Sequence, residues 1–67
     1  MQTISVVIRE DERNLLAKQV YSYFSSIIPR VGETLIIQRH PPYQVTKVIH
    51  IISNGNASVT LEVKEVI

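Results

Sequence analysis

The sequence predicts a small all-β domain, and three observations support this fold class. Runs of β-branched residues alternate with polar residues at the two-residue period of a β-strand. An Asn-Gly pair, the strongest short signal for a tight hairpin, joins the last two runs. Proline and glycine separate the central runs. The chain has 67 residues, so residues 1–67 are expected to form a single domain, because half of this length would bury too small a core.

The first predicted strand covers Thr3–Arg9. Ile4, Val6 and Ile8 fall on one face at the period of a strand, and β-branched residues dominate the segment. The charged run over residues 10–14 ends this strand and is expected to be an exposed turn.

The next stretch, residues 15–28, fits two structures. Its apolar residues recur at helical spacing, and Asn14 is a suitable helix cap. However, Val20–Ile28 is rich in β-branched, aromatic and serine residues, which is a poor composition for a helix interior. We therefore predict a strand over Val20–Ser26 with an irregular or short helical lead-in. The alternative is an α+β fold, in which residues 14–27 form a helix that packs on a four-stranded antiparallel sheet.

Two rigid segments frame the third predicted strand. Pro29–Glu33 is expected to be a turn, because proline lacks a backbone donor and Gly32 can adopt a positive φ. The strand follows at Thr34–Gln38. Arg39–Pro42 then forms a stiff loop, because two consecutive prolines fix φ and disfavour helix.

The longest predicted strand, Tyr43–Ser53, contains an irregularity. Tyr43 and Val45 share a face, but the apolar rhythm then passes to Val48, His50 and Ile52. The phase slips by one residue near Thr46 and Lys47, as a β-bulge would produce.

The last two strands form the predicted hairpin. Asn54-Gly55 suits a type I′ turn. Every second residue from Ala57 to Val63 is apolar and is expected to face the core, whereas the residues between them are polar. Five short strands, with a bulged long strand that enters a tight hairpin, most economically form a small five-stranded SH3-like barrel.

The central third of the chain resembles a pattern in short bacterial and phage proteins. Residues 28–33 supply a Pro-Arg-x-Gly-Glu turn, and residues 43–50 supply the strand pattern Tyr-x-Val-x-x-Val-x-His. Those proteins are similar to SH3-like β-barrels, so the resemblance implies the same fold for this chain. It implies no activity, because no shared activity accompanies the pattern.

Composition argues against several classes of protein. Cysteine is absent, which excludes disulfides and cysteine-based metal sites. No apolar run approaches the ~20 residues of a membrane span, and the N-terminus lacks the pattern of a secretory signal, so a cytoplasmic location is expected. The seven cations are scattered and six acids offset them, which argues against a nucleic-acid-binding surface.

The motifs also argue against catalysis. With two glycines, the chain has neither a Gly-x-Ser-x-Gly elbow nor a phosphate-binding glycine loop. Its two histidines, His40 and His50, have no carboxylate at a diagnostic metal-ligand spacing. We therefore predict no catalytic residue, no metal site and no cofactor, and we expect that the protein is not an enzyme.

Five residues make up the predicted ligand-binding site. Arg39 and His40 lie on the stiff loop beside Tyr43, and this set can stack a base and hold a phosphate. Arg30 presents a planar guanidinium on its turn, which suits a phosphate or a carboxylate. His50, on the longest strand, completes the predicted groove. The structural alternatives are an ion pair within the turn for Arg30, a place in the core for Tyr43, and a bond to a backbone carbonyl for His50.

A subunit contact is also predicted. So small a domain without disulfides is expected to gain stability from a partner. Ile36, Ile49 and Ile51 lie on the face opposite the predicted core residues, and either the N-terminal segment or a second copy must cover them. Tyr23 is assigned to the same interface, because aromatic residues are enriched at contact cores. We therefore expect a homodimer or a higher oligomer.

These features favour a non-enzymatic binding module that self-associates and holds an anionic or nucleotide-like ligand in a groove. The first alternative is a protein–protein adaptor or inhibitor, such as a phage accessory or counter-defence factor, that docks a partner protein through an apolar sheet face. The second alternative is a weak nucleic-acid binder, whose affinity would fall steeply with salt.

Overall fold

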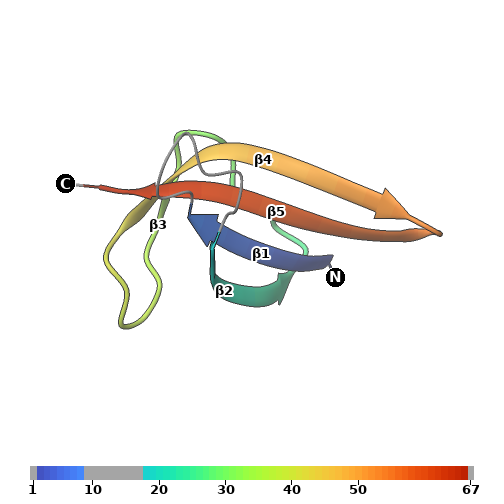
Figure 1. The fold of residues 1–67 in the computed structure, drawn as a ribbon, viewed down its shortest axis with the longest axis horizontal. Coiled ribbons are helices and arrows are strands. Elements are labelled where there is room, and N and C mark those ends of the chain that lie inside the picture. The colour runs from blue at the N-terminus through green and yellow to red at the C-terminus, as the bar shows by residue number, and fades with distance from the viewer. Residues whose placement is uncertain (1, 9–17, 67) are drawn as a thin grey trace.

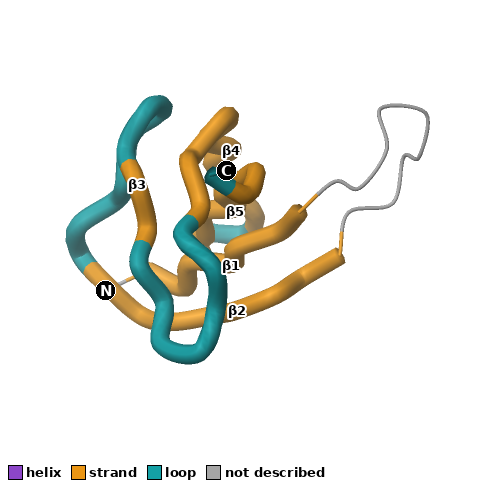
Figure 2. Tube along the Cα trace, turned by 90° about the vertical axis from the view of Figure 1, so that its left-hand side faces the viewer, coloured by secondary structure: helices purple, strands orange, loops and turns teal. Residues whose placement is uncertain are grey.

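The computed structural model describes residues 2–8 and 18–66, which form five strands and no helix (Figure 1). The strands are β1 (Gln2–Ile8), β2 (Lys18–Ser25), β3 (Thr34–Leu35), β4 (Tyr43–Ser53) and β5 (Asn56–Glu65). They form one sheet in the order β2-β1-β5-β4-β3, in which β1 and β5 are parallel and the other neighbours are antiparallel. The sheet curls into a half-barrel (Figure 2), so the predicted all-β class is confirmed, and the architecture is consistent with a small five-stranded SH3-like barrel.

Strand β2 resolves the ambiguity between helix and strand. It runs over Lys18–Ser25, close to the predicted Val20–Ser26, and it pairs with β1 along its length. The alternative helix is therefore wrong for residues 18–27, while residues 14–17 and the predicted turn at 10–14 lie outside the described residues. The pairing shifts after Val6, which leaves Val20 without an opposite residue on β1. Such a bulge bends a strand and increases its twist, which favours the curl of the sheet.

Strand β3 is shorter than predicted. The expected strand over residues 34–38 stops at Leu35, which pairs with Tyr43. Continued pairing in the same register would set the next two residues opposite Pro42 and Pro41. Proline has no backbone N–H to donate to a ladder, so the strand ends where its partner becomes proline.

The hairpin of β4 and β5 has the predicted turn and the predicted bulge. Asn54 and Gly55 have φ values of 51° and 80°, the two positive angles that a type I′ turn requires. The register shifts between Val45 and Lys47, so Thr46 is the bulged residue, and its Oγ1 donates to the backbone oxygen of Glu62 at 3.1 Å.

One part of the predicted alternation is wrong at the end of this hairpin. Ala57 and Ile52 face each other across the two strands, and both are exposed, although they were expected to face the core. The described pairing of β1 with β5 begins at Ser58, so β1 does not flank this part of the hairpin. The core side chains therefore end before the hairpin does.

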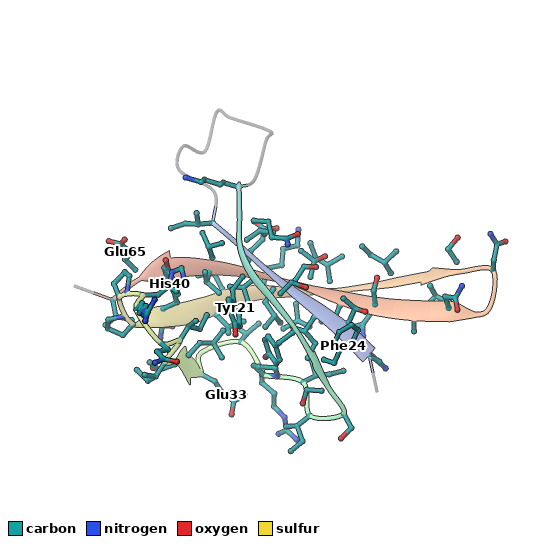
Figure 3. The ribbon with its side chains drawn as sticks, turned by 90° about the horizontal axis from the view of Figure 1, so that it is seen from below. Tyr21, Phe24, Glu33, His40 and Glu65 are labelled. Carbon is teal, nitrogen blue, oxygen red and sulfur yellow. The ribbon has the colours of Figure 1, made fainter. Side chains whose placement is uncertain are left out.

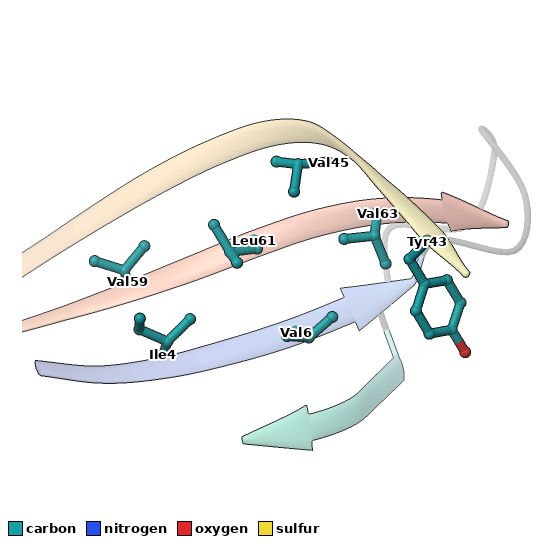
Figure 4. Close-up of a cluster of buried hydrophobic side chains, with 7 residues drawn as sticks. All are labelled: Ile4, Val6, Tyr43, Val45, Val59, Leu61 and Val63. Atoms are coloured by element: carbon teal, nitrogen blue, oxygen red, sulfur yellow. The ribbon is translucent and has the colours of Figure 1, made fainter. Parts of the chain in front are cut away.

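The core lies on the concave face of the sheet (Figure 4). The first, fourth and fifth strands contribute its buried side chains, which are Ile4, Val6, Tyr43, Val45, Val59, Leu61 and Val63. Partly buried residues from β1, β2, β3 and β4 and from the segments beside β3 pack around them. The alternation predicted for β1 and for Val59–Val63 is therefore confirmed.

Candidate functional site

A tight turn between β3 and β4 presents His40. The backbone N–H of His40 donates to the carbonyl oxygen of Ile37 at 3.0 Å. Arg39, inside this turn, has φ of 68°, in the left-handed region that residues other than glycine seldom adopt. The turn and the two prolines that follow fix the backbone on both sides of His40, as expected for a stiff loop.

Four aromatic rings form a continuous row that starts on β2 and ends on β4. The row runs Tyr23, Tyr21, His40, Tyr43, and each neighbouring pair of ring centroids is 6.2 Å apart. The interplanar angles are 33°, 63° and 47°, in the range of tilted and edge-to-face contacts. We call these four residues the aromatic row.

The aromatic row spans the open side of the half-barrel. Tyr21 and Tyr23 lie opposite Val6 and Ile4 of β1, so their side chains share the concave face with the core. No strand pairing among the described residues joins β2 to β3, the two outer strands of the sheet. The contact between Tyr21 and His40 therefore links the two sides of an unclosed barrel. Figure 3, seen from below, shows Tyr21 at the middle of the sheet and His40 toward the end of β5.

A pocket of about 320 Å³ lies beside the aromatic row. Its lining comes from β2 and from the segment that begins with β3, namely Tyr21, Tyr23, Leu35, Ile36, Ile37 and Gln38. The volume is at the lower end of the range for small-molecule sites, and the mixture of apolar walls with a few polar groups is typical of them. Burial raises the pKa of the Tyr23 phenol above its ordinary value of 10.0. Like any tyrosine hydroxyl, it is protonated at neutral pH and able to donate a hydrogen bond.

The structure brings together part of the predicted ligand-binding site. His40 and Tyr43 are neighbours in the aromatic row, and Arg39 lies next to His40 on the exposed turn. Tyr43 is buried in the core, the alternative considered for it, and its ring contacts that of His40 from there.

Arg30 and His50 lie apart from the aromatic row, with no hydrogen bond or ring contact to it. Arg30 begins a turn that Glu33 closes in two ways. The backbone N–H of Glu33 donates to the carbonyl oxygen of Arg30, and the carboxylate of Glu33 accepts from the backbone N–H of Arg30. The expected ion pair in this turn is thus replaced by a bond to the backbone. His50 is exposed on β4, opposite Val59.

The predicted interface residues divide between two faces of the sheet. Tyr23 and Ile36 line the pocket on the concave face. Ile51 lines a second hollow, of about 540 Å³, together with Phe24 and hydroxyl-bearing residues of β1 and β5. Ile49 precedes it by two positions on β4 and therefore shares its face.

Sequence reasoning missed Tyr21 and Gln38 as site residues. Tyr21 alternates with Tyr23, which places both rings on one face of a strand. Which face that is depends on the register with β1, and the sequence does not specify this register.

The part of the chain that the structure describes has no group of three His, Asp or Glu side chains placed to hold a metal ion. It also contains no helix of the length and apolarity needed to cross a membrane. Comparison with known proteins finds no matching family model, curated protein or solved structure. The resemblance of residues 28–50 to short bacterial and phage proteins stays a prediction.

Proposed function

We propose that the protein is a non-enzymatic binding module that holds a nucleotide-like ligand on the aromatic row. The observation that carries this proposal is the row itself, four rings at even spacing beside an apolar pocket on the open side of the half-barrel. Aromatic side chains that follow one another along a groove are the usual platform for bases, because every base has a π-face.

The two ends of the site suit the two parts of such a ligand. A base fits the pocket against Tyr21 and Tyr23, where a protonated Tyr23 hydroxyl and the Gln38 amide offer hydrogen bonds. A phosphate suits the exposed turn, where the Arg39 guanidinium lies next to His40. The left-handed backbone at Arg39 supports a role in binding, because strained conformations of non-glycine residues concentrate at functional sites.

Native mass spectrometry of protein purified directly from cells is the first test. We expect a stoichiometric additional mass of a few hundred daltons, released by denaturation. The second test is a titration with ribonucleoside monophosphates and short oligonucleotides, followed by the ring signals of the tyrosines in NMR spectra. Affinity for the preferred ligand should weaken moderately as salt rises, because few cations contact the phosphate.

Three variants test which residues bind the ligand. Tyr21→Leu keeps an apolar side chain at a half-exposed position and removes the ring, so we expect affinity to fall about tenfold, in line with ~1–3 kcal/mol per stacked base. Arg39→Gly removes the guanidinium while it keeps the backbone angle, and it should weaken binding and flatten the salt dependence. Phe24→Leu is the control, because it removes an exposed ring from the other face. Equal affinities for Tyr21→Leu and Phe24→Leu would contradict the proposal.

A second candidate function is a protein–protein adaptor or inhibitor that docks a partner on the outer face. The observation that favours it is the hollow between Phe24 and Ile51, two large apolar side chains that stay exposed. Phe24→Ser should then abolish capture of the partner, whereas Tyr21→Leu should not affect it.

A further inference from the structure

The outer half of β4 has a free edge. Strand β3 pairs with β4 only at Tyr43 and Gln44, and the turn before it bonds to the backbone of Val45. Beyond the bulge at Thr46, the segment Val48–Ser53 pairs with β5 alone among the described strands. Figure 1 shows this part of β4 running along β5, with no strand drawn on its other side. We call Val48–Ser53 the β4 edge.

The β4 edge lacks the features that normally protect such edges. Natural edge strands carry lysine, proline, bulges or inward charges, which prevent pairing with another chain. The β4 edge has no proline and no Lys, Arg, Asp or Glu, and its sequence is Val-Ile-His-Ile-Ile-Ser. The bulge lies before it rather than within it. This edge is therefore suited to pairing with another strand.

The hairpin register determines which backbone groups point outward. In a two-residue hairpin, the residues that flank the turn exchange both hydrogen bonds, and these are Ser53 and Asn56. Bonding then alternates along the strand, so Ser53, Ile51 and Ile49 bond to β5. Val48, His50 and Ile52 consequently direct their N–H and C=O groups to the open side.

The geometry points to a second copy of this chain as the partner, paired antiparallel along the β4 edge about a two-fold axis at His50. In this register Val48 lies opposite Ile52 of the second copy on the concave face. Ile49 lies opposite Ile51 of the second copy on the outer face. Each apolar side chain thus meets another apolar side chain on both faces, and about six backbone hydrogen bonds form.

Neighbouring registers match less well. Moving the axis to Ile51 sets Ile49 against Ser53 and His50 against Ile52. Moving it to Ile49 sets Ile51 against Lys47 next to the bulge. The same segment therefore supplies both halves of a matched contact in one register only, as an isologous interface requires.

The contact is small, so the dimer is expected to be weak. An edge of six residues gives an interface at the low end of specific interfaces, below ~1,200 Å² in total. We therefore expect the average molecular mass to rise from that of one chain to that of two as the protein concentration increases over roughly 10–500 µM. This behaviour corresponds to a dissociation constant in the micromolar range. The contact is independent of the aromatic row, so it can fail while the proposed ligand site stands.

Cysteine scanning tests the register directly, because the natural chain has no cysteine. At the two-fold axis, the Cα atoms of a hydrogen-bonded pair are about 5.5 Å apart, within the range for a disulfide. His50→Cys should therefore form a covalent dimer under mild oxidation. Ile52→Cys is the matched control on the same edge, because the two introduced cysteines, one from each chain, would have Cα atoms ~14 Å apart. Equal cross-linking of both variants, or none with His50→Cys, would overturn the proposal.

Sedimentation equilibrium tests the noncovalent dimer. His50→Pro removes one outward N–H and blocks the edge, while His50→Ala keeps the backbone donor, so only the proline variant should stay monomeric. Ile51→Lys is the second disruptive variant, for use if the proline variant does not fold. Ile36→Lys is its control, because Ile36 is also an exposed isoleucine but lies on the segment after β3, away from the β4 edge. A wild type that stays monomeric at 500 µM, or a folded Ile51→Lys variant that still dimerises, would overturn the proposal.

Discussion

The stability of the fold should depend on where a methylene group is removed. Ile4 of β1 is 0% exposed at the centre of the core, whereas Ile52 near the hairpin turn is 79% exposed. The substitutions Ile4→Val and Ile52→Val delete the same group from the same residue type, and both positions lie in strands where valine is well suited. Any difference between them therefore reports burial rather than chemistry or strand propensity.

The magnitude follows from the two environments. Burial of one methylene contributes about 0.8 kcal/mol, and incomplete collapse of the site adds a cavity cost, which gives ~0.5–1.5 kcal/mol for a buried Ile→Val change. A domain of this size has a total stability of about 3–10 kcal/mol, so Ile4→Val removes a substantial part of it. We expect a loss of about 1 kcal/mol and a fall in Tm of ~4–8 °C. Ile52→Val should stay within about 0.5 kcal/mol of the wild type.

Urea unfolding followed by circular dichroism measures both variants. Protein at about 5 µM keeps the chain below the expected range of dimerisation. The midpoint should fall for Ile4→Val at an unchanged m-value, because the surface exposed on unfolding is nearly the same. A loss for Ile52→Val as large as that for Ile4→Val would refute the placement of the hairpin end outside the core.

Three further predictions concern the turns and Tyr23. Gly55→Ala should cost about 1–2 kcal/mol in thermal unfolding, because its φ is 80°. Apart from its two chain neighbours, no atom lies within 4 Å of the added Cβ, so only backbone strain opposes the change. An unchanged Tm would contradict the type I′ turn. Glu33→Ala should lower the free energy of unfolding by about 1 kcal/mol, because the backbone N–H of Arg30 loses its acceptor. Glu33→Gln keeps a side-chain oxygen that can accept this bond, so it should retain most of the stability. Equal losses for the two variants would contradict this role. Burial raises the pKa of Tyr23 above 10.0, so its contribution to stability is complete below that pH and disappears as pH rises through the folded-state pKa. The difference in ultraviolet titration between wild type and Tyr23→Phe should place this ionisation above pH 10.0.

Local patterns in the sequence predicted the hairpin in detail. Asn54-Gly55 requires two positive φ angles, and few residue pairs other than this one tolerate them. The slip of phase near Thr46 identified the bulge, because a strand with a period of two can change face only by gaining or losing a residue. Both features depend on neighbouring residues, so the sequence alone was sufficient.

The aromatic row depends on contacts that are distant in the sequence. Tyr21 meets His40 only because β1 pairs with β5 in parallel and thereby sets β2 and β3 at opposite edges of the curled sheet. No local pattern indicates that the first and last strands pair. The sequence therefore predicted the stiff loop and His40 within it, but not the ring on β2 that faces it.

The open pocket and the β4 edge have a common cause in the short β3. Pro41 and Pro42 end its pairing on one side, and the turn from Arg30 to Glu33 ends it on the other. Because β3 cannot extend, the half-barrel stays open beside the aromatic row, and the outer half of β4 gains no neighbour. Replacing both prolines with residues that carry an N–H would remove the first limit. We would then expect β3 to lengthen into Ile36 and Ile37, and the pocket that these residues line to narrow as a result.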